Sequence, residues 1–429
     1  MIAIIGGGIT GLSLAYFLKN KGYDVTVLEK DSQLGGNASW TNLGKFQVGI
    51  FYHIITNRDT CLLGLIKDLG IEDKLFPVET KMGFFQKDKL YSISTPKEFF
   101  TFSPLSVFER FKLGMLILKS RAVRDWRKLD VITASEWLLR EGGAGNFKKL
   151  WQPIMNAKFG PASDDVVATD MWFRINRLSD LRKKGSGSGV YAMRGGLKVL
   201  FDCLEKSLIG NGVRILKNTG VETIETDKTR VTGIILNNRQ RLTCDKIIST
   251  IALANLQGLL PADFQEYAAS LSRIRYLDNI CLVLRLKERF SPYYQLNIAE
   301  PGFPFTGIIG ADCLYPSEDF GNGYVLYISR YLLRGDSIYN MDKEQLLDHY
   351  YPYLKMINPG FDKKSVLDIS LTKRMNVEPL HTLNYSKLIP SFDSPVNNFY
   401  LMCTAQIYPE PTVLNASVEY TSRLVNKFF

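Results

Sequence analysis

Three glycines close to the start of the chain have the spacing of a nucleotide-binding turn. Gly6, Gly8 and Gly11 form the pattern GxGxxG directly after the apolar run at residues 2–5. In such a turn the first glycine allows the tight bend, the second lets a pyrophosphate approach the backbone, and the third lets helix and strand pack closely. Glu29 follows 18 residues after Gly11, where its carboxylate can accept hydrogen bonds from ribose hydroxyls and would repel a 2′-phosphate. The pattern predicts a site for FAD or NAD rather than NADP.

The elements around this turn follow the order strand, helix, strand. The apolar run at residues 2–5 is typical of a buried parallel strand, apolar residues at helical spacing continue to about Gly22, and residues 25–28 form a second strand. The helix would then begin at the glycine turn and offer free N–H groups to a phosphate. The alternative, a strand, turn and helix without a ligand, requires the position of Glu29 to be a coincidence.

The rest of the chain changes its pattern several times. Residues 103–150 favour helices, and residues 150–160 indicate an aromatic turn that contains a proline. Residues 276–335 alternate apolar and polar positions as antiparallel strands do, and residues 342–358 favour another helix. The stretch KKGSGSG at 183–189 indicates a flexible domain boundary. Because 429 residues exceed the usual size of one domain, we expect two interleaved domains.

Composition and charge limit the classes of function. Lysine and arginine outnumber aspartate and glutamate by 53 to 43, a net charge of +10 that favours anionic partners. The basic residues are scattered and no nucleic-acid-binding signature accompanies them, so we expect no nucleic-acid partner. The strand predicted at residues 2–5 leaves no room for a signal peptide, and no apolar run reaches the length of a membrane span. We therefore expect a cytoplasmic protein. The six cysteines are far apart and are expected to be buried free thiols: Cys61, Cys203, Cys244, Cys281, Cys313 and Cys403.

A second glycine pair separates FAD from NAD. Gly35 and Gly36, followed by Asn37 in the run GGNA, come just after the second strand. This run resembles the phosphate and ribityl contact in flavoproteins of the amine oxidase, protoporphyrinogen oxidase and UDP-galactopyranose mutase superfamily. An ordinary Gly-Gly loop is the alternative. Three further stretches are similar to segments of that superfamily in the same order: YAMRGGLKVLFDCLEK, NTGVETIETDKTRVTGIIL with KIISTIAL, and NFYLMCTAQIYPEPTVLNASVEY.

The resemblance implies an FAD cofactor and the residues that would hold it. Val221 would meet the adenine through its backbone, and Asn415 and Ala416 would place a helix N-terminus at the flavin pyrimidine. The C-terminal segment departs from the family pattern, because Cys403 and Thr404 replace the expected glycine and acid. The full expected cofactor set is Gly6, Gly8, Ile9, Thr10, Gly11, Glu29, Lys30, Gly35, Gly36, Asn37, Val221, Thr250, Thr404, Asn415 and Ala416.

The same resemblance implies an α/β fold, α+β overall. A Rossmann-like FAD-binding domain of the glutathione reductase type would be interleaved with a mixed helical and antiparallel-sheet substrate domain. The FAD-binding domain is predicted to comprise residues 1–75, 186–258 and 385–429. The substrate domain is predicted to comprise residues 76–185 and 259–384.

Few side chains are candidates for catalysis, so the flavin is expected to carry the difficult step. The three histidines suggest no Ser/His/Asp arrangement, and no metal-ligand spacing is visible, so no metal is expected. The candidates are His53 near the flavin, Lys158, Arg174, Arg177 and Tyr408. A structural histidine is the favoured alternative for His53, and the lysine and arginines could either hold an anionic substrate or form structural ion pairs.

Three functions remain open at this stage. The first is an FAD-dependent oxidoreductase that oxidises a small-molecule substrate, anionic or isoprenoid-like, by hydride transfer to flavin N5. The second is a non-redox flavoenzyme similar to UDP-galactopyranose mutase acting on a sugar nucleotide, although its histidine-containing turn is not reproduced around His53. The third is a flavin-binding protein without turnover.

Residues 104–129 combine an apolar stripe with many basic residues. Two interpretations stay open for this stretch. It could pack on its own domain with a basic face in solvent, or it could be a peripheral membrane contact or substrate-access helix. The oligomeric state is not predicted.

Overall fold

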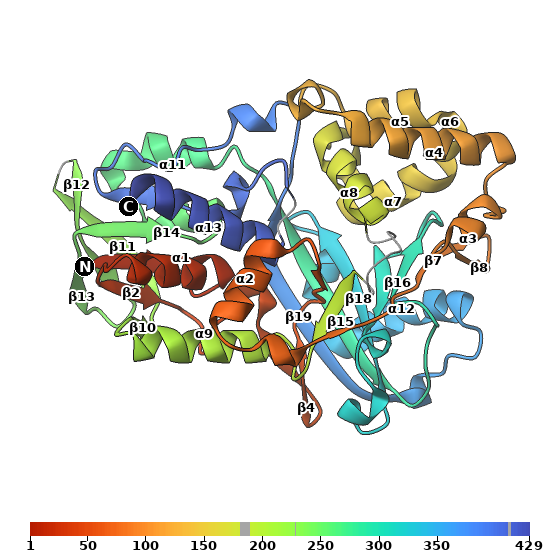
Figure 1. Cartoon of the computed structure of the whole chain (residues 1–429), viewed down its shortest axis with the longest axis horizontal. Coiled ribbons are helices and arrows are strands. Elements are labelled where there is room, and N and C mark those ends of the chain that lie inside the picture. Colours follow the sequence, from red (N-terminus) through yellow and green to blue (C-terminus); the bar gives the residue numbers. More distant parts are fainter. Residues whose placement is uncertain (181–188, 228, 411–412) are drawn as a thin grey trace.

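The computed structural model describes residues 1–180, 189–227, 229–410 and 413–429. Two lobes lie side by side along the long axis (Figure 1). One is built on a parallel sheet and carries both termini, and the other is built on a larger, mostly antiparallel sheet with a group of helices beside it. The predicted α/β class, α+β overall, is confirmed.

The first lobe contains a five-stranded sheet in which every neighbouring pair is parallel. Its order is β10 (Arg214–Leu216), β2 (Val25–Leu28), β1 (Ile2–Ile5), β14 (Lys246–Ser249) and β20 (Phe399–Leu401). Strand β1 is fully buried and pairs with β2 and β14 on its two sides. The carboxyl ends of these central strands therefore meet at one edge, where ligands bind in open α/β sheets.

Helices cover this sheet and fix its glycine turn. The helix α1 (Ile9–Asn20) joins β1 to β2, and α13 (Leu414–Phe428) packs against it. The hydroxyls of Ser13 and Thr421 lie 2.9 Å apart in this buried contact. The surrounding helices are α2 (Thr60–Asp68), α9 (Lys198–Gly210), α10 (Leu253–Leu256) and α11 (Gln265–Leu271). Smaller sheets join β11 (Val221–Asp227), β12 (Arg230–Leu236) and β13 (Arg241–Thr243), and β5 (Ile55–Thr56), β9 (Val190–Met193) and β6 (Leu75–Pro77).

The second lobe is built on a seven-stranded sheet. Its order is β19 (Val366–Pro379), β15 (Tyr276–Leu286), β18 (Tyr324–Leu332), β17 (Gly307–Gly310), β16 (Gln295–Ile298), β7 (Met82–Gln86) and β8 (Lys89–Ser92). All neighbours are antiparallel except β16 and β7. The hairpin of β3 (Trp40–Leu43) and β4 (Phe46–Gly49) contacts β19 and β15, so the segment after the second glycine pair reaches the second lobe.

Helices α12 (Lys343–Ile357) and α4 to α8 complete the second lobe. We call the group α4 (Val107–Ala122), α5 (Ala134–Gly142), α6 (Ala144–Asn146), α7 (Gln152–Phe159) and α8 (Ala168–Asp180) the helical cap. Its core packs Leu116, Trp137, Met155 and Ile175 together with Leu277 of β15. The cap therefore rests on the strand that also borders the parallel-sheet lobe.

Several predicted elements are confirmed and one is wrong. The helix predicted at 342–358 is α12, and the alternating stretch at 276–335 contributes β15 to β18. Residues 150–160 were expected to form a turn, but α7 runs through them. Pro153 lies in the first turn of this helix, where the missing N–H would have had no helical partner anyway.

The predicted domain boundary is not tested, and the prediction of buried cysteines is only partly confirmed. Residues 183–188 of the predicted boundary lie outside the described residues, and the division into domains stays a prediction. All six cysteines are free, but not all are buried: Cys244, Cys281 and Cys403 are buried, whereas Cys61, Cys203 and Cys313 are partly exposed.

Among the helices in the described ranges, none has both the length and the apolar character needed to cross a bilayer.

The two faces of α4 allow a matched test of packing. Leu116 is 0% exposed within the core of the cap, whereas Leu118 is 59% exposed on the same helix. We expect Leu116→Ala to lower the free energy of unfolding by about 2–5 kcal/mol, because it leaves a cavity. Leu118→Ala removes the same atoms from solvent-facing positions and should change it by about 0.5 kcal/mol or less. Denaturant unfolding of both variants measures this, and equal losses would contradict the assigned faces.

Candidate functional site

The glycine turn brings three backbone segments unusually close. A Cβ on Gly11 would lie 1.9 Å from the carbonyl oxygen of Gly6, and a Cβ on Gly6 would lie 2.6 Å from the Oγ1 of Thr250. Gly6 also has a φ of +110°, which favours glycine. These two glycines are therefore required by the protein's own packing, as the sequence pattern predicts.

Gly8 differs from its neighbours because the described residues leave the space beside it almost open. A Cβ there would have one atom within 4 Å, the Cα of Gly36 at 3.9 Å. Gly8 is the N-cap of α1 and supplies no side-chain cap, so the first N–H groups of the helix, in the turn of Ile9 and Thr10, face this space. An open cradle of backbone donors at a helix N-terminus fits a pyrophosphate.

Glu29 closes the turn from the second strand. Its carboxylate accepts hydrogen bonds from the backbone N–H of Gly7 at 2.7 Å and of Asp31 at 2.8 Å. Burial raises the pKa of Glu29, whereas these backbone hydrogen bonds oppose the rise. The backbone N–H of Thr219 donates to the carbonyl of Glu29, which brings the start of β11, with Val221, to the same edge. Lys30 follows on the exposed surface.

The second glycine pair lies directly against the first. The backbone N–H of Gly35 donates to the carbonyl of Gly7, and a Cβ on Gly36 would lie 3.3 Å from the Cα of Gly8. Gly35 has a φ of +106°. The Asn37 side chain donates to the carbonyl of Val377 on β19 at 3.4 Å. The pair thus joins the predicted pyrophosphate site to the second lobe.

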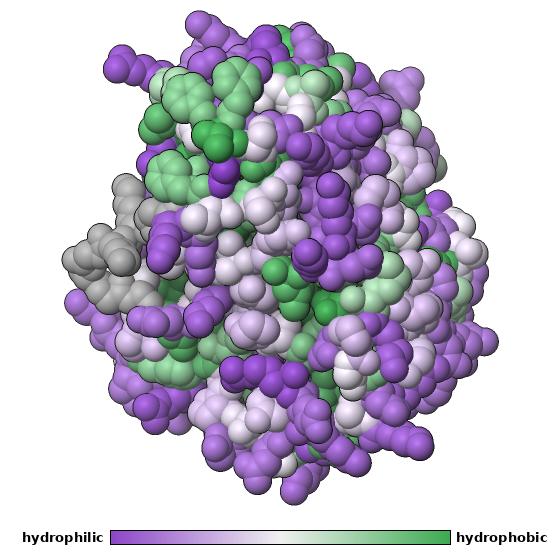
Figure 2. Space-filling view, turned by 90° about the vertical axis from the view of Figure 1, so that its right-hand side faces the viewer, coloured by the Kyte–Doolittle hydropathy of each residue, from purple (hydrophilic) through white to green (hydrophobic). Residues whose placement is uncertain are grey.

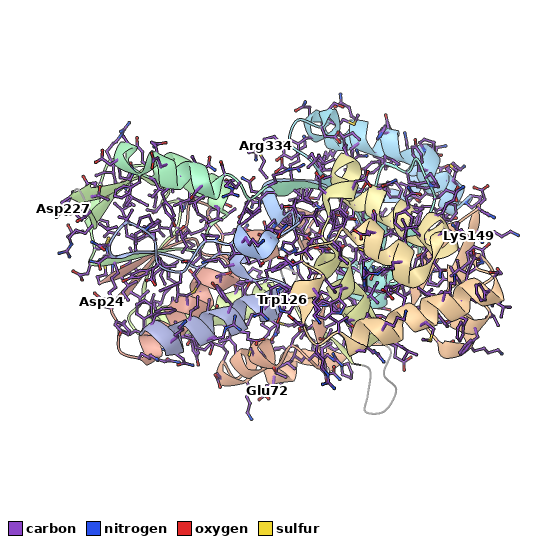
Figure 3. All side chains as sticks on the ribbon, turned by 90° about the horizontal axis from the view of Figure 1, so that it is seen from above. Asp24, Glu72, Trp126, Lys149, Asp227 and Arg334 are labelled. Carbon is purple, nitrogen blue, oxygen red and sulfur yellow. The ribbon has the colours of Figure 1, made fainter. Side chains whose placement is uncertain are left out.

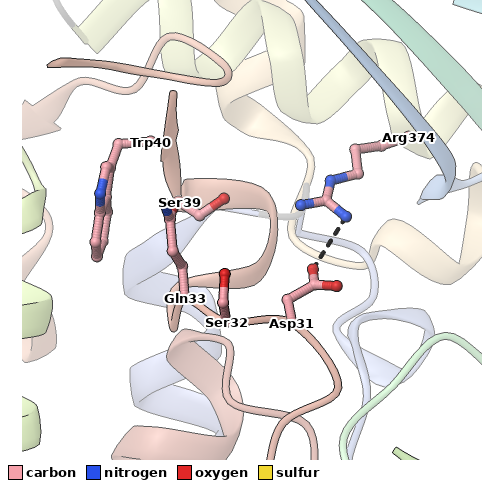
Figure 4. Close-up of a pocket in the computed structure, with 6 residues that line it drawn as sticks. All are labelled: Asp31, Ser32, Gln33, Ser39, Trp40 and Arg374. Carbon is pink, nitrogen blue, oxygen red and sulfur yellow. Dashed lines mark hydrogen bonds and ion pairs between the residues drawn. The ribbon is translucent and has the colours of Figure 1, made fainter. Parts of the chain in front are cut away.

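A small polar pocket of about 200 Å³ opens beside this pair (Figure 4). It is lined by Asp31, Ser32, Gln33, Ser39, Trp40 and Arg374. Arg374 of β19 forms an ion pair with Asp31 at 3.1 Å, which again ties the two lobes together. This volume is below that of most small-molecule sites, so the pocket suits a polar group at the border of the nucleotide site rather than a whole substrate.

The remaining predicted cofactor residues directly follow β14, come soon after β20, or begin α13. The hydroxyl of Thr250 donates to the carbonyl of Ile5 at 2.9 Å, directly after β14. Thr404 begins a short 3-10 turn directly after Cys403. Asn415 and Ala416 lie in the first turn of α13, and the side-chain Oδ1 of Asn415 accepts a hydrogen bond from the backbone N–H of Leu62.

A buried network of charges lies where the helical cap meets β19. Lys158 of α7 donates to both carboxylate oxygens of Glu378, at 3.0 and 3.1 Å, and Arg174 of α8 donates to Glu378 at 2.6 Å. Arg174 also pairs with Asp170 at 2.5 Å, and His381 Nδ1 lies 3.2 Å from the same carboxylate. Lys158 and Arg174 therefore form structural ion pairs, the second of the two roles considered for them from the sequence.

The charges of this network compensate one another. Burial would raise the pKa of Glu378, but Lys158 and Arg174 outweigh it and hold the pKa below its usual value of 4.5. Burial would likewise raise the pKa of Asp170, but Arg174 and His381 hold it below 3.8. Burial and the charge of Arg174 lower the pKa of Lys158, and Glu378 opposes this. Two cations thus face two carboxylates with little net charge.

Arg177 and Tyr408 form none of these ion pairs, although the Tyr408 ring meets that of His381 edge-on at 5.0 Å. In the part of the chain that the structure describes, Arg177 has no ion-pair partner; burial raises the pKa of Glu410, and the charge of Arg177 opposes this rise. The Tyr408 hydroxyl donates to Asp130 at 2.5 Å, and its ring meets that of Trp126 edge-on at 5.1 Å. Trp126 lies between the two lobes when the molecule is seen from above (Figure 3). Tyr408 therefore joins the C-terminal segment to the cap.

His53 and Tyr52 lie on the segment beneath the second lobe. His53 Nδ1 is 3.2 Å from the carbonyl of Phe51, and burial lowers the pKa of His53, so its imidazole is neutral at pH 7. Tyr52 is 37% exposed, yet burial raises its pKa to about 12. The Tyr52 ring meets that of Tyr327 edge-on at 6.4 Å.

Several members of this site carry no local sequence signal. Glu378 and Asp170 are ordinary acidic residues at a strand end and in a first helical turn, and their partners in the network include residues more than 200 positions away. Tyr331 of β18 also belongs to it, because Lys158 lies over its ring at 4.3 Å.

Gly8 offers a selective test of the cofactor site. We expect Gly8→Val to weaken FAD binding by about tenfold or more, equivalent to about 1.4 kcal/mol or more, because the new side chain occupies the open cradle. The fold should survive, since Gly8 has an ordinary φ of −75° and a Cβ there meets no protein atom closely. Flavin absorption of the purified protein and titration of the apoprotein with FAD provide the measurement.

Gly64→Val is the matched control, because a Cβ at Gly64 on α2 also meets nothing within 4 Å. It should leave FAD affinity unchanged. Equal FAD affinity of Gly8→Val and the wild-type protein would show that the cradle is not the pyrophosphate site.

The charge network predicts an acid-sensitive stability. Because the pKa values of Glu378 and Asp170 are depressed in the folded state, their contribution is fully present above their ordinary values and is lost as the pH falls through the folded values. Glu378→Gln should lower the free energy of unfolding at neutral pH by about 3–5 kcal/mol, since it leaves Lys158 buried and poorly compensated. It should also reduce the further loss below about pH 4.5. Denaturant unfolding across pH measures both effects.

Glu266→Gln on the exposed surface is the control and should follow the wild-type curve. A Glu378→Gln variant with wild-type stability at neutral pH would contradict the compensation described above.

Comparison with known proteins agrees with this geometry. The family model described as flavin containing amine oxidoreductase matches residues 9–397. The chain is 25% identical over 311 residues to a zeta-carotene desaturase from Synechocystis sp., covering 65% of this chain and 63% of that protein. It is 26% identical over 282 residues to a coproporphyrinogen III oxidase from Staphylococcus aureus, covering 58% of this chain and 60% of that protein. The matches thus span less than two thirds of the length of either relative.

The fold also resembles that of solved flavoproteins. The crystal structure of reduced UDP-galactopyranose mutase superposes with a TM-score of 0.75 over 99% of this chain and 93% of that chain, at 14% identity. This likeness shows the fold alone. The expected FAD cofactor and the predicted class of FAD-dependent oxidoreductase are confirmed by the family match, which covers most of the chain. The chain belongs to the flavin-containing amine oxidoreductase family.

Proposed function

We propose that this protein oxidises a small, uncharged and largely apolar substrate by hydride transfer to flavin N5. When bound, FAD supplies the acceptor for the hydride and its two electrons. The protein itself holds the cofactor at the glycine cradle and α1, and orients the substrate between the two lobes. The support for each part comes from the residues around the junction of the lobes.

The charge compensation at this junction carries the proposal. Lys158 and Arg174, two of the cations expected to hold an anionic substrate, are already paired with Glu378 and Asp170. Moving either cation to a substrate would leave a buried carboxylate uncompensated, which costs several kcal/mol (about 3–5). An uncharged substrate avoids this cost.

The surfaces next to the network are aromatic. Tyr52 is partly exposed, meets Tyr327 edge-on at 6.4 Å, and is close enough to Glu378 and Arg174 for their charges to act on its pKa. Tyr331 lies under Lys158. Aromatic rings contribute large apolar contact areas with few rotatable bonds, which suits an extended apolar or conjugated molecule. The name of one relative, a zeta-carotene desaturase, fits such a substrate.

Action on a sugar nucleotide is the second candidate. Its support is Arg177, which is half-buried and lies outside the ion-pair network in the described part of the chain. The fold shared with UDP-galactopyranose mutase agrees with it. One unpaired arginine provides less compensation than a diphosphate needs, so we place this candidate behind the first.

Anaerobic mixing separates the two candidates. We expect the oxidised holoprotein to lose its visible flavin absorption when mixed with zeta-carotene in detergent, and UDP-galactopyranose to have no effect on the oxidised protein. Dithionite-reduced holoprotein should not interconvert the pyranose and furanose forms of the sugar nucleotide, as followed by chromatography. Ring interconversion without flavin bleaching by the apolar donor would replace our proposal by the second candidate.

A pair of variants at Tyr52 tests, within the same assay, whether its ring contacts the substrate. Tyr52→Ala removes the ring and should raise the concentration of apolar donor needed for half-maximal bleaching by about tenfold. Tyr52→Phe keeps the ring and should behave like the wild-type protein. Equal behaviour of all three proteins would show that Tyr52 does not line the substrate site.

A further inference from the structure

An unpartnered apolar patch covers the outer face of α3 and α4. On α4, Val107, Phe108, Phe111 and Leu118 are 75%, 66%, 64% and 59% exposed, and Phe100 at the end of α3 (Pro96–Phe100) is 70% exposed. We call these five residues the apolar patch. In the space-filling view apolar residues gather at the upper left, over this part of the molecule (Figure 2). Large exposed patches of this kind mark interaction surfaces.

The patch occupies one face of a helix whose opposite face is already used. At about 100° per residue, Val107, Phe108, Phe111 and Leu118 fall within an arc of about 100°. Leu113 and Leu116 point to the opposite side and are buried in the core of the cap. The helix therefore packs on the cap through its buried face, and the exposed phenylalanines do not take part in this packing.

Basic residues border the patch on both sides. Arg110 and Arg121 flank one edge of the apolar arc and Lys112 and Lys119 flank the other, as the helical spacing places them. Lys112 lies over the ring of Phe108 at 4.9 Å, and Arg110 donates to the carbonyl of Phe100. Residues 96–122 contain five lysines and arginines and two glutamates.

The glutamates of this segment are turned away from the patch. Glu109 is bonded to Lys149 of the cap at 2.7 Å and to the N-terminus of its own helix. Glu98 caps α3 through the backbone N–H of Thr95. Lys119 is paired with Glu141 of α5 at 2.9 Å. Four basic residues against this one carboxylate still leave the rim around the phenylalanines net positive.

We propose that the apolar patch docks on the surface of an anionic lipid bilayer. Phenylalanines in an arc of this width insert at the level of the headgroups, while flanking lysines and arginines reach the lipid phosphates. A second copy of the chain is a poorer occupant, because a two-fold contact would bring the two positive rims together. The proposal rests on α3 and α4 and is independent of the substrate.

Sedimentation of the full-length holoprotein with vesicles tests the docking. We expect the protein to bind vesicles of phosphatidylcholine and phosphatidylglycerol at least about tenfold more tightly than vesicles of phosphatidylcholine alone, and to be released by added salt. The variant Phe108→Ser/Phe111→Ser should bind about tenfold or more weakly. Its thermal midpoint and flavin content should match the wild type, because both rings are exposed.

The control is Ile209→Ser/Met356→Ser, which removes two exposed apolar residues far from the patch, 54% and 45% exposed. This variant should bind vesicles as the wild type does. Equal vesicle binding by wild type and Phe108→Ser/Phe111→Ser would overturn the proposal. Absence of wild-type binding to either kind of vesicle would also overturn it. If the wild type then forms a dimer in analytical ultracentrifugation and the Phe108→Ser/Phe111→Ser variant does not, the patch binds a second copy of the chain instead.

Discussion

The arrangement of the second lobe depends on one carboxylate placed between two buried cations. Glu378 ends the longest strand of the large sheet and joins Lys158 and Arg174, which belong to different helices of the cap. Without it, two positive charges would stay buried side by side, and the cap would lose its polar connection to β19. Because β19 also carries Arg374, which pairs with Asp31, the same strand joins both the cap and the nucleotide lobe.

The cofactor lobe depends on a different constraint, the distance between backbones. Gly6 and Gly11 permit a contact that no side chain could survive, and a Cβ on Gly36 would press against the Cα of Gly8, whereas Gly8 itself leaves space that the described residues do not fill. Packing thus explains three of these glycines, and a ligand explains Gly8. This division matters for interpretation, because a glycine pattern alone does not say which positions serve the fold and which serve the cofactor.

The extent of sequence prediction follows from the range of the interactions involved. One strand-helix-strand unit contains the turn at Gly6, Gly8 and Gly11, the helix after it and Glu29. Their arrangement could therefore be predicted from their spacing in the sequence. The charge network could not be predicted in the same way. Lys158 was recognised as a candidate, but its partner is 220 positions away, and nothing near Glu378 marks it. The expected turn at 150–160 failed for a local reason, since a proline in a first helical turn resembles a proline in a loop.

The two faces of the helical cap have opposite chemistry. Inward, Lys158 and Arg174 are buried and compensated; outward, α4 exposes phenylalanines within a basic rim. Such an arrangement is costly for a helix surrounded by water, because exposed aromatic rings gain nothing from the fold and lower solubility. The packing of α4 uses only Leu113, Leu116 and their neighbours. Polar residues at 108 and 111 would therefore serve stability equally well, which agrees with the proposed docking of these phenylalanines on a bilayer.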